Sequence, residues 1–174
     1  MATLIKNKRV AQNPWLLLKA EDTVPATGDV IVPLAVWTTQ REALLKRMGS
    51  VGVLLENTDD PRSLVTDFAK LGVIAVRFPK FTDGRAYSQA RLLRERLGYT
   101  GELRATGVVL RDQLPFLLRC GFDSFESGQP GFGEALGKAR TLFSVVYQPV
   151  GDGRITAGEL RLRQLRQPAS LAAD

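Results

Sequence analysis

The fold of this chain is decided by residues 73–98, Val73-Ile-Ala-Val-Arg-Phe-Pro-Lys-Phe-Thr-Asp-Gly-Arg-Ala-Tyr-Ser-Gln-Ala-Arg-Leu-Leu-Arg-Glu-Arg-Leu-Gly98. The apolar run 73–78 predicts a buried strand, and a polar turn follows it. Ala86, Ala90, Leu93 and Leu97 then recur at helical spacing and give one apolar face. The stretch therefore predicts one strand–turn–helix unit of a parallel α/β fold.

The polar turn of this unit is dense in side chains that bind ligands. In parallel α/β folds, ligands meet the protein where a strand ends and a helix begins. The twelve residues from position 77 to position 88 carry Arg77, Lys80, Thr82, Asp83, Arg85, Tyr87 and Ser88. The turn predicts a binding place for an anion, but it does not name a reaction. Tyr87 and Ser88 fit either ligand contact or completion of the helix cap.

Glycine divides the middle of the chain at regular intervals. Gly49, Gly72, Gly98 and Gly121 each follow a helical pattern, with separations of 23, 26 and 23 residues. Glycine commonly stops a helix because it enters the left-handed region without a Cβ clash. The spacing predicts about five short βα units in a mainly parallel sheet, either open and doubly wound or curled as an incomplete (β/α) barrel.

The other units follow the same pattern. In the first, the strand spans 30–37, Thr39 and Glu42 have capping-box spacing, and Pro33 implies an edge position or a late strand start. In the second, Asp60 and Pro61 predict the start of the helix. We expect the remaining strands at 51–55, 102–107 and 122–125, and the remaining helices at 110–119 and 134–142.

The two ends depart from this repeat. Residues 4–18 predict a small hairpin, so residues 1–28 form an N-terminal extension of a single α/β domain spanning 1–150. Residues 143–148, Phe-Ser-Val-Val-Tyr-Gln, predict one more strand. Residues 151–174 predict a polar C-terminal tail.

Composition narrows the chemistry. The 174 residues carry a net charge of +6, which favours anionic partners. The absence of histidine excludes Ser-His-Asp and Cys-His catalysis and most zinc sites. The single cysteine, Cys120, and the lack of an apolar leader or span predict a cytoplasmic protein that does not enter a membrane. The sequence does not identify a cofactor, because no Gly-x-Gly-x-x-Gly follows a predicted strand.

Positive charge is concentrated around the polar turn. Residues 77–119 hold nine Lys or Arg and four Asp or Glu, which accounts for +5 of the +6. Five cations lie at predicted strands or turns and form an oxyanion candidate: Arg77, Lys80, Arg85, Arg104 and Arg111. Ion pairing with Asp83, Glu102 and Asp112 is the structural alternative.

A family resemblance covers most of residues 1–148. Residues 78–98, together with Gly101-Glu-Leu-Arg-Ala-Thr-Gly107, Leu110-Arg-Asp-Gln-Leu114 and Cys120-Gly-Phe-Asp-Ser-Phe125, resemble the signature of a bacterial family of unknown function. Members of that family are commonly encoded beside assimilatory sulfite reductase. The resemblance implies an oxidoreductase role in sulfite reduction, inferred from gene neighbourhood, although no catalytic motif is evident here.

One position departs from the expected family pattern. Where the family is expected to have Gly-Asp-Val-Leu-Arg-Asp-Gln, this chain has Gly107-Val-Val-Leu-Arg-Asp-Gln113, so Val108 replaces an acid. Asp83 and Asp112 remain the acidic candidates for proton transfer.

Two functional interpretations follow. In the first, a sulfur-assimilation protein associated with sulfite reduction binds a small oxyanion or a sulfonucleotide at the basic carboxyl edge of the sheet. In the second, a non-catalytic accessory module docks on sulfite reductase or on an acidic electron carrier. Nucleic acid is a third and less favoured partner than the first two, because exposed aromatic residues do not alternate with the cations. The exposed ends of an incomplete barrel would also permit a homodimer.

Overall fold

A computed structural model describes residues 3–6, 9–150 and 152–166. Its centre is a sheet with the strand order β2-β1-β8-β7-β6-β5-β4-β3. Strands β3 to β8 are parallel neighbours in chain order, whereas β1 pairs antiparallel with both β2 and β8. The strands are β1 (Thr3–Lys6), β2 (Arg9–Ala11), β3 (Trp15–Leu17), β4 (Asp29–Pro33), β5 (Val51–Leu55), β6 (Leu71–Phe78), β7 (Glu102–Gly107) and β8 (Ser124–Ser127).

The sheet is strongly curled. Strands β2 and β3 lie at its two opposite edges, yet residues 12–14 alone connect them. Four Cα steps from Ala11 to Trp15 span at most about 15 Å. The edges of a flat sheet of this width would be about 34 Å apart. The sheet therefore bends into a half-barrel, with the short N-terminal connection crossing its concave side.

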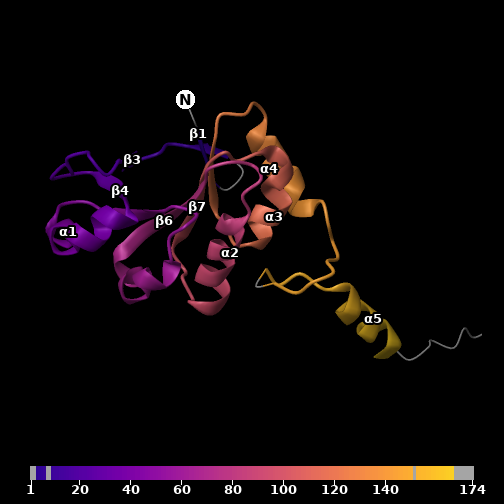
Figure 1. The fold of residues 1–174 in the computed structure, drawn as a ribbon. Helices are drawn as coiled ribbons and strands as arrows, with labels where there is room; N and C mark the ends of the chain where they lie inside the picture. Colours follow the sequence, from indigo (N-terminus) through magenta and orange to yellow (C-terminus); the bar gives the residue numbers. More distant parts are fainter. Residues whose placement is uncertain (1–2, 7–8, 151, 167–174) are drawn as a thin grey trace, which may run out of the picture.

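Helices cover the convex face of the sheet (Figure 1). The main hydrophobic core lies between them and alternate residues of the strands, among them Val53, Val76 and Phe125. The helices are α1 (Leu34–Lys46), the 3-10 helix η1 (Pro61–Lys70), α2 (Arg85–Arg91) with its π-helical continuation η2 (Leu92–Arg96), the 3-10 turn η3 (Arg111–Gln113), α3 (Leu114–Arg119), α4 (Phe132–Thr141) and α5 (Ala157–Arg166).

The predicted α/β class with a mainly parallel sheet is confirmed. The sequential strand order is that of an incomplete barrel wall, since an open doubly wound sheet reverses its order at one point. The antiparallel hairpin of β1 and β2 is also as predicted. The pairing of β1 with β8 and the short edge strand β3 were not predicted. Among the described residues, no helix has the length and apolar content needed to cross a bilayer.

The first βα unit differs from the prediction. Strand β4 ends at Pro33, and α1 begins at Leu34, so residues 34–37 are helical instead of extended. Proline lacks an N–H for the ladder and suits a strand end. Thr39 is not the N-cap, because it lies inside α1 and its Oγ1 donates to the carbonyl oxygen of Ala35 at 3.0 Å. Residues 34–37 resemble a strand in composition because this helical turn buries Val36 and Trp37.

The prediction of a strand at 143–148 is wrong. This segment has one isolated bridge, Val146 to Thr156, while Phe143 is 51% and Tyr147 is 88% exposed. A strand needs a neighbouring strand whose backbone N–H and C=O groups are unpaired. This segment has no such neighbour, because it leaves the sheet towards α5 (Figure 1). Helix α5 lies inside the segment expected to be a polar tail.

The glycine pattern holds at three of its four positions. Gly49, Gly98 and Gly121 have positive φ, as expected of helix stops. Gly72 instead lies inside β6, directly after η1. A Cβ there would lie 2.7 Å from the Cη2 atom of Trp15, so close approach of the indole, not a helix stop, requires glycine.

Candidate functional site

The turn between β6 and α2 is held by Asp83. Its carboxylate accepts hydrogen bonds from the backbone N (3.1 Å), Nε (3.0 Å) and Nη2 (2.7 Å) of Arg85, and it also accepts one from Asn57. The Arg85 side chain is the main reason that the pKa of Asp83 lies well below its ordinary value. Because Asn57 follows β5, Asp83 ties two neighbouring loops together. A carboxylate with this low pKa is a poor proton acceptor.

The end of β6 carries a second ion pair. Arg77 Nε donates to Glu56 Oε1 at 2.7 Å, and both side chains are only partly buried. In the register of the sheet Arg77 is level with Thr106 of β7, so its side chain lies on the concave face. Glu56 is held in turn by Gln89 of α2, whose Nε2 donates to the carbonyl oxygens of Glu56 (2.8 Å) and Asp59 (2.7 Å).

The exposed cations at this edge are Lys80, Arg85 and Arg111. The Lys80 ammonium has no hydrogen bond or ion pair with any residue that the structure describes. Arg111 lies at the start of η3, and its Nη1 donates to the carbonyl oxygen of Pro130 at 3.3 Å. Thr82 and Asp112 are exposed on the same loops. The edge therefore offers positive charge to solvent, with one cation fully uncommitted.

Tyr87 and Ser88 have different environments. The Tyr87 ring packs edge-on against Phe78, with 5.1 Å between the centroids, and burial raises the pKa of its phenol. Ser88 is exposed and lines a shallow hollow on the outer side of α2 with Arg91 and Arg96. Neither side chain caps α2, because Asp83 Oδ1 accepts the hydrogen bond from the backbone N of Arg85, the first residue of the helix.

Arg104 is separated from the other candidate cations. It is fully buried in the middle of β7, on the concave face. Its Nη2 and Nε donate to Glu102 Oε1 at 2.7 and 3.1 Å, and its Nη1 donates to Asn13 Oδ1 at 3.0 Å and Glu126 Oε1 at 3.3 Å. The ion pair with Glu102 that the sequence offered as an alternative is therefore present.

This concave-face network extends beyond Arg104. Lys6 Nζ donates to Glu102 Oε2 at 2.6 Å, Ser124 Oγ donates to Glu102 Oε1 at 2.6 Å, and Thr106 Oγ1 donates to Glu126 Oε2 at 2.7 Å. We call these residues, with Arg104 and Asn13, the lumen network. Its donors are matched by acceptors within the protein, so it stabilises the sheet instead of presenting charge to a ligand.

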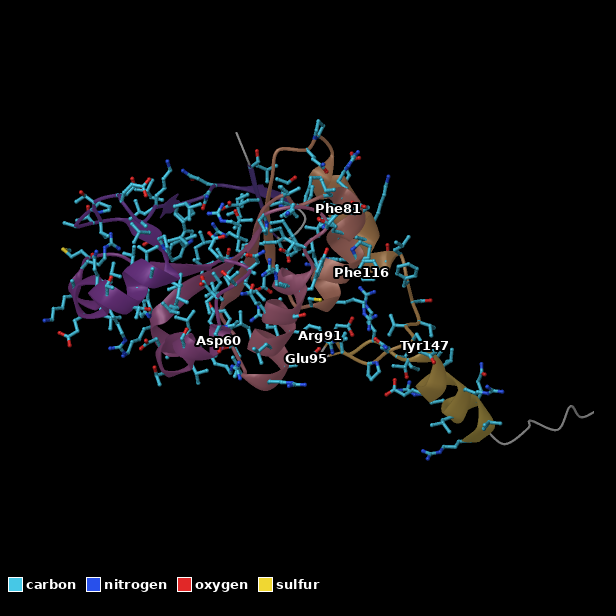
Figure 2. All side chains as sticks on the ribbon, in the orientation of Figure 1. Asp60, Phe81, Arg91, Glu95, Phe116 and Tyr147 are labelled. Carbon is cyan, nitrogen blue, oxygen red and sulfur yellow. The ribbon has the colours of Figure 1, made fainter. Side chains whose placement is uncertain are left out.

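Exposed apolar side chains accompany the cations at the carboxyl edge, which the sequence analysis did not predict. Phe81 is 53% and Val108 is 41% exposed on the edge loops, and Phe116, in the middle of α3, is 64% exposed (Figure 2). Phe81 and Val108 lie on neighbouring loops, because the backbone N–H of Val108 donates to the carbonyl oxygen of Phe78 at 2.8 Å. A phenylalanine inside a polar turn was the available sequence signal.

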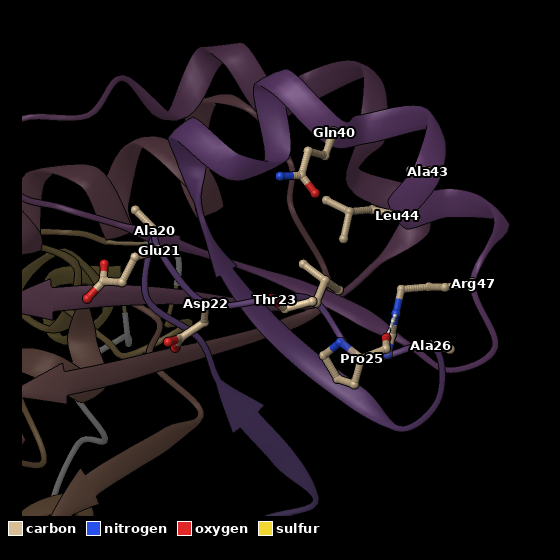
Figure 3. A pocket seen from close by; sticks show the side chains of 11 residues that line it. Ala20, Glu21, Asp22, Thr23, Pro25, Ala26, Gln40, Ala43, Leu44 and Arg47 are labelled. Atoms are coloured by element: carbon tan, nitrogen blue, oxygen red, sulfur yellow. Dashed lines mark hydrogen bonds between the residues drawn. The ribbon is translucent and has the colours of Figure 1, made fainter.

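Several hollows of the surface lie away from this edge. The first, between residues 20–26 and α1, has a volume of about 560 Å³ (Figure 3). Another, of about 310 Å³, contains Cys120, and burial raises the pKa of that thiol to about 11. Such a thiol stays protonated and unreactive at neutral pH. Within the described parts of the chain, no cluster of His, Cys, Asp or Glu has the arrangement of a metal site.

The fold and the edge define a small α/β half-barrel protein with a basic, partly apolar surface at the carboxyl ends of its strands. A family model described as "Bacterial protein of unknown function (DUF934)" matches residues 52–157, more than half of the chain. The chain belongs to this family, as the resemblance predicted. The search of curated proteins found no match. The search of solved structures found none either.

Proposed function

We propose that this protein is an accessory module of sulfur assimilation that docks an acidic protein through the carboxyl edge of its sheet. The observation that carries the proposal is the exposed pair of Phe81 and Val108 beside the cations Lys80, Arg85 and Arg111. An apolar centre with a polar rim is the usual anatomy of a protein interface.

The identity of the partner rests on the family resemblance. Association with sulfite reduction gives two partner classes, sulfite reductase itself and an acidic electron carrier. Cations around an apolar centre favour a partner with a complementary negative surface and would accelerate association at low salt. The substitution that places Val108 where an acid is expected makes this edge less negative and more apolar, which also suits docking.

The experiment measures binding of the purified protein to purified sulfite reductase and to an acidic electron carrier at low and high salt. We expect Phe81→Ala and Lys80→Glu each to weaken binding by about tenfold, as truncation of an interface anchor does. The matched controls are Val65→Ala and Arg96→Glu, which change exposed residues on other parts of the surface. If neither partner binds, or if the controls weaken binding equally, the docking proposal fails.

A small oxyanion or sulfonucleotide is the second candidate ligand. The proximity of Arg77, Lys80 and Arg85 at the end of one strand favours it, because arginine binds planar and tetrahedral oxyanions through paired hydrogen bonds. A thermal-shift screen with sulfite, sulfate, phosphate, adenylylated sulfates, flavins and NADPH tests it. A specific ligand raises the melting temperature, and Arg85→Ala with Lys80→Ala should abolish an oxyanion shift. An oxyanion shift that survives both substitutions would exclude this site.

A further inference from the structure

The C-terminal helix, α5, extends away from the rest of the molecule (Figure 1). Residues 142–150 and 152–156 lead away from α4, and α5 stands at the end of the molecule opposite α1 (Figure 1). No residue of α5 is buried, and Leu162 and Leu165 are 56% and 76% exposed. These two leucines are three residues apart, so they share one face of the helix.

The helix is nevertheless specified by its own sequence. Thr156 and Glu159 form a capping box: Glu159 Oε2 accepts from Thr156 N at 2.8 Å, and Thr156 Oγ1 accepts from Glu159 N at 3.2 Å. A helix as short as this one is marginal in water unless an apolar face is packed. A helix with a well-formed start and an unpacked leucine face indicates a contact with another molecule.

The segment 152–156 and α5 together form an arm, and the base of this arm is anchored to the domain. Arg119 Nε and Arg154 Nε lie 3.3 and 3.5 Å from Asp152 Oδ2, and Arg154 Nη2 donates to the carbonyl oxygen of Arg140 at 3.1 Å. These bonds fasten the chain before α5 to α3 and α4. The arm therefore leaves the domain in a defined direction, and its helix does not turn back onto the domain.

The groove between residues 20–26 and α1 has a mainly polar lining with a small apolar part. Val24 and Pro25, which are half-buried, supply the apolar part, and Glu21 and Asp22 lie at one end (Figure 3). The Glu21 side chain is 73% exposed and is 4.0 Å from its nearest cation, Lys19. Most other paired carboxylates, such as Asp67 and Asp83, are in short ion pairs with the chain's own arginines.

Two further features make this groove a docking surface. Arg47 Nη2 donates to the carbonyl oxygens of Pro25 and Thr27 at 3.0 and 3.1 Å, which fixes the loop against the end of α1. Met48, whose backbone N–H donates to the carbonyl oxygen of Ala26 at 3.2 Å, is 75% exposed beside it. Exposed methionine is typical of surfaces that receive an apolar helix.

We propose that α5 of one copy lies in the groove of a second copy, with the exchange made reciprocally in a homodimer. Leu162 and Leu165 would face Val24 and Pro25, the apolar part of the groove. Arg161 lies one turn before Leu165 and Arg166 one turn after Leu162, so both flank the leucines and can meet Glu21 and Asp22.

The geometry favours a second copy over other occupants. The chain's own groove is at the far end of the molecule from α5 (Figure 1), so α5 does not reach it, and the helix that we propose to occupy it belongs to another copy. A face of two leucines is narrow for a helix that lies on a membrane, which usually carries a broad apolar face. Reciprocal exchange makes the same contact twice and closes the assembly at two copies. This proposal is independent of docking at the carboxyl edge.

The test measures the mass of the full chain by analytical ultracentrifugation over a range of concentrations. We expect a dimer that dissociates on dilution and at high salt. Glu21→Lys with Asp22→Lys should make the protein monomeric, and so should Arg161→Glu with Arg166→Glu. Mixing the two variants should restore a dimer. One contact then joins the reversed groove to the reversed helix, whose charges attract, and the other contact joins the two unchanged surfaces.

Matched controls use charges away from the contact. Arg163→Glu changes the same helix away from the leucine face, and Glu42→Lys changes the outer side of α1, so both should stay dimeric. Circular dichroism verifies that each variant is folded. A wild-type chain that is monomeric at every concentration would overturn the proposal, and so would a dimer that persists in both charge-reversed variants or is not restored by mixing them.

Discussion

The two halves of the concave sheet face are built from opposite chemistry. In the half formed by β4, β5 and β6, the inward side chains, apart from Arg77 at the carboxyl end of β6, include Ile31, Leu54, Val73 and Ala75, each at most 2% exposed and packed with Trp15. In the half formed by β7, β8 and β1, the inward positions hold the lumen network around Arg104. Both halves belong to the same pleated and curved sheet.

The difference shows how each half is stabilised. The apolar half depends on burial and close packing, which do not need a specific partner for each side chain. The polar half depends on matched charges, because a buried ionic group is tolerated only when its partners are present. Loss of the buried cation of the polar half should therefore cost more than truncation of one apolar side chain, and substitutions within the apolar half should not alter the response to pH.

The strongest test of this comparison is Arg104→Met. Methionine fills much of the same space but leaves the Glu102 and Glu126 carboxylates without their shared buried cation. We expect the free energy of unfolding to fall by about 3–5 kcal/mol, as for a buried pair that loses one partner. Urea denaturation measures this loss, with the exposed Arg96→Met as control. A loss near zero would show that the lumen network is not required.

In the apolar half, the corresponding change is Leu54→Ala. Leu54 is 2% exposed, and its truncation leaves a cavity against Ile31 and Val73. We expect a loss of about 3 kcal/mol, independent of pH between neutral and mildly acidic conditions. The matched control is Leu45→Ala, at a partly exposed position of α1. A pH-dependent loss would contradict the division between the two halves.

The smallest expected effect on stability comes from removing the charge of Glu102 in the polar half while keeping the shape of its side chain. Burial by itself would raise the pKa of Glu102, but hydrogen bonds from Lys6, Ser124 and Arg104 outweigh it and hold the pKa below the ordinary 4.5. The ionised group therefore stabilises the fold above its unfolded pKa, and this contribution is lost as pH falls through the lower folded value.

Glu102→Gln should accordingly cost about 1.5 kcal/mol at neutral pH. The variant should also lose less stability than the wild type when the pH falls from about 5 to about 3. Urea denaturation across this pH range provides the measurement. Equal slopes for the two proteins would mean that Glu102 does not contribute to the acid sensitivity.

Local patterns in the sequence predicted much of the fold. The apolar runs gave β5, β6 and β7 within a residue or two, and Asp60 with Pro61 marked the start of η1 as expected. The errors occurred where a local apolar pattern is compatible with more than one structure. Residues 34–37 and 143–148 are apolar enough for a strand, but one became a buried helical turn and the other found no free sheet edge.

The sequence placed the candidate cations at one edge of the sheet, and the structure separates one of them from the others. The sequence placed Arg77, Lys80 and Arg85 together because they lie on one turn. It also included Arg104, whose side chain lies buried on the concave face. Arg104 is two residues before Thr106, the residue of β7 that is level with Arg77. Its pairing with Asn13 joins residues 91 positions apart, which no local pattern can show.

By itself, the sequence determined the α/β class, the parallel units and the basic turn after β6, because periodicity, glycine and charge act over short distances along the chain. The tertiary structure alone decided that the sheet curls, that its concave face divides into an apolar and an ionic half, and that α5 leaves the domain. Those outcomes depend on which distant residues meet: three connecting residues between opposite edges, and one buried arginine shared by Glu102, Glu126 and Asn13.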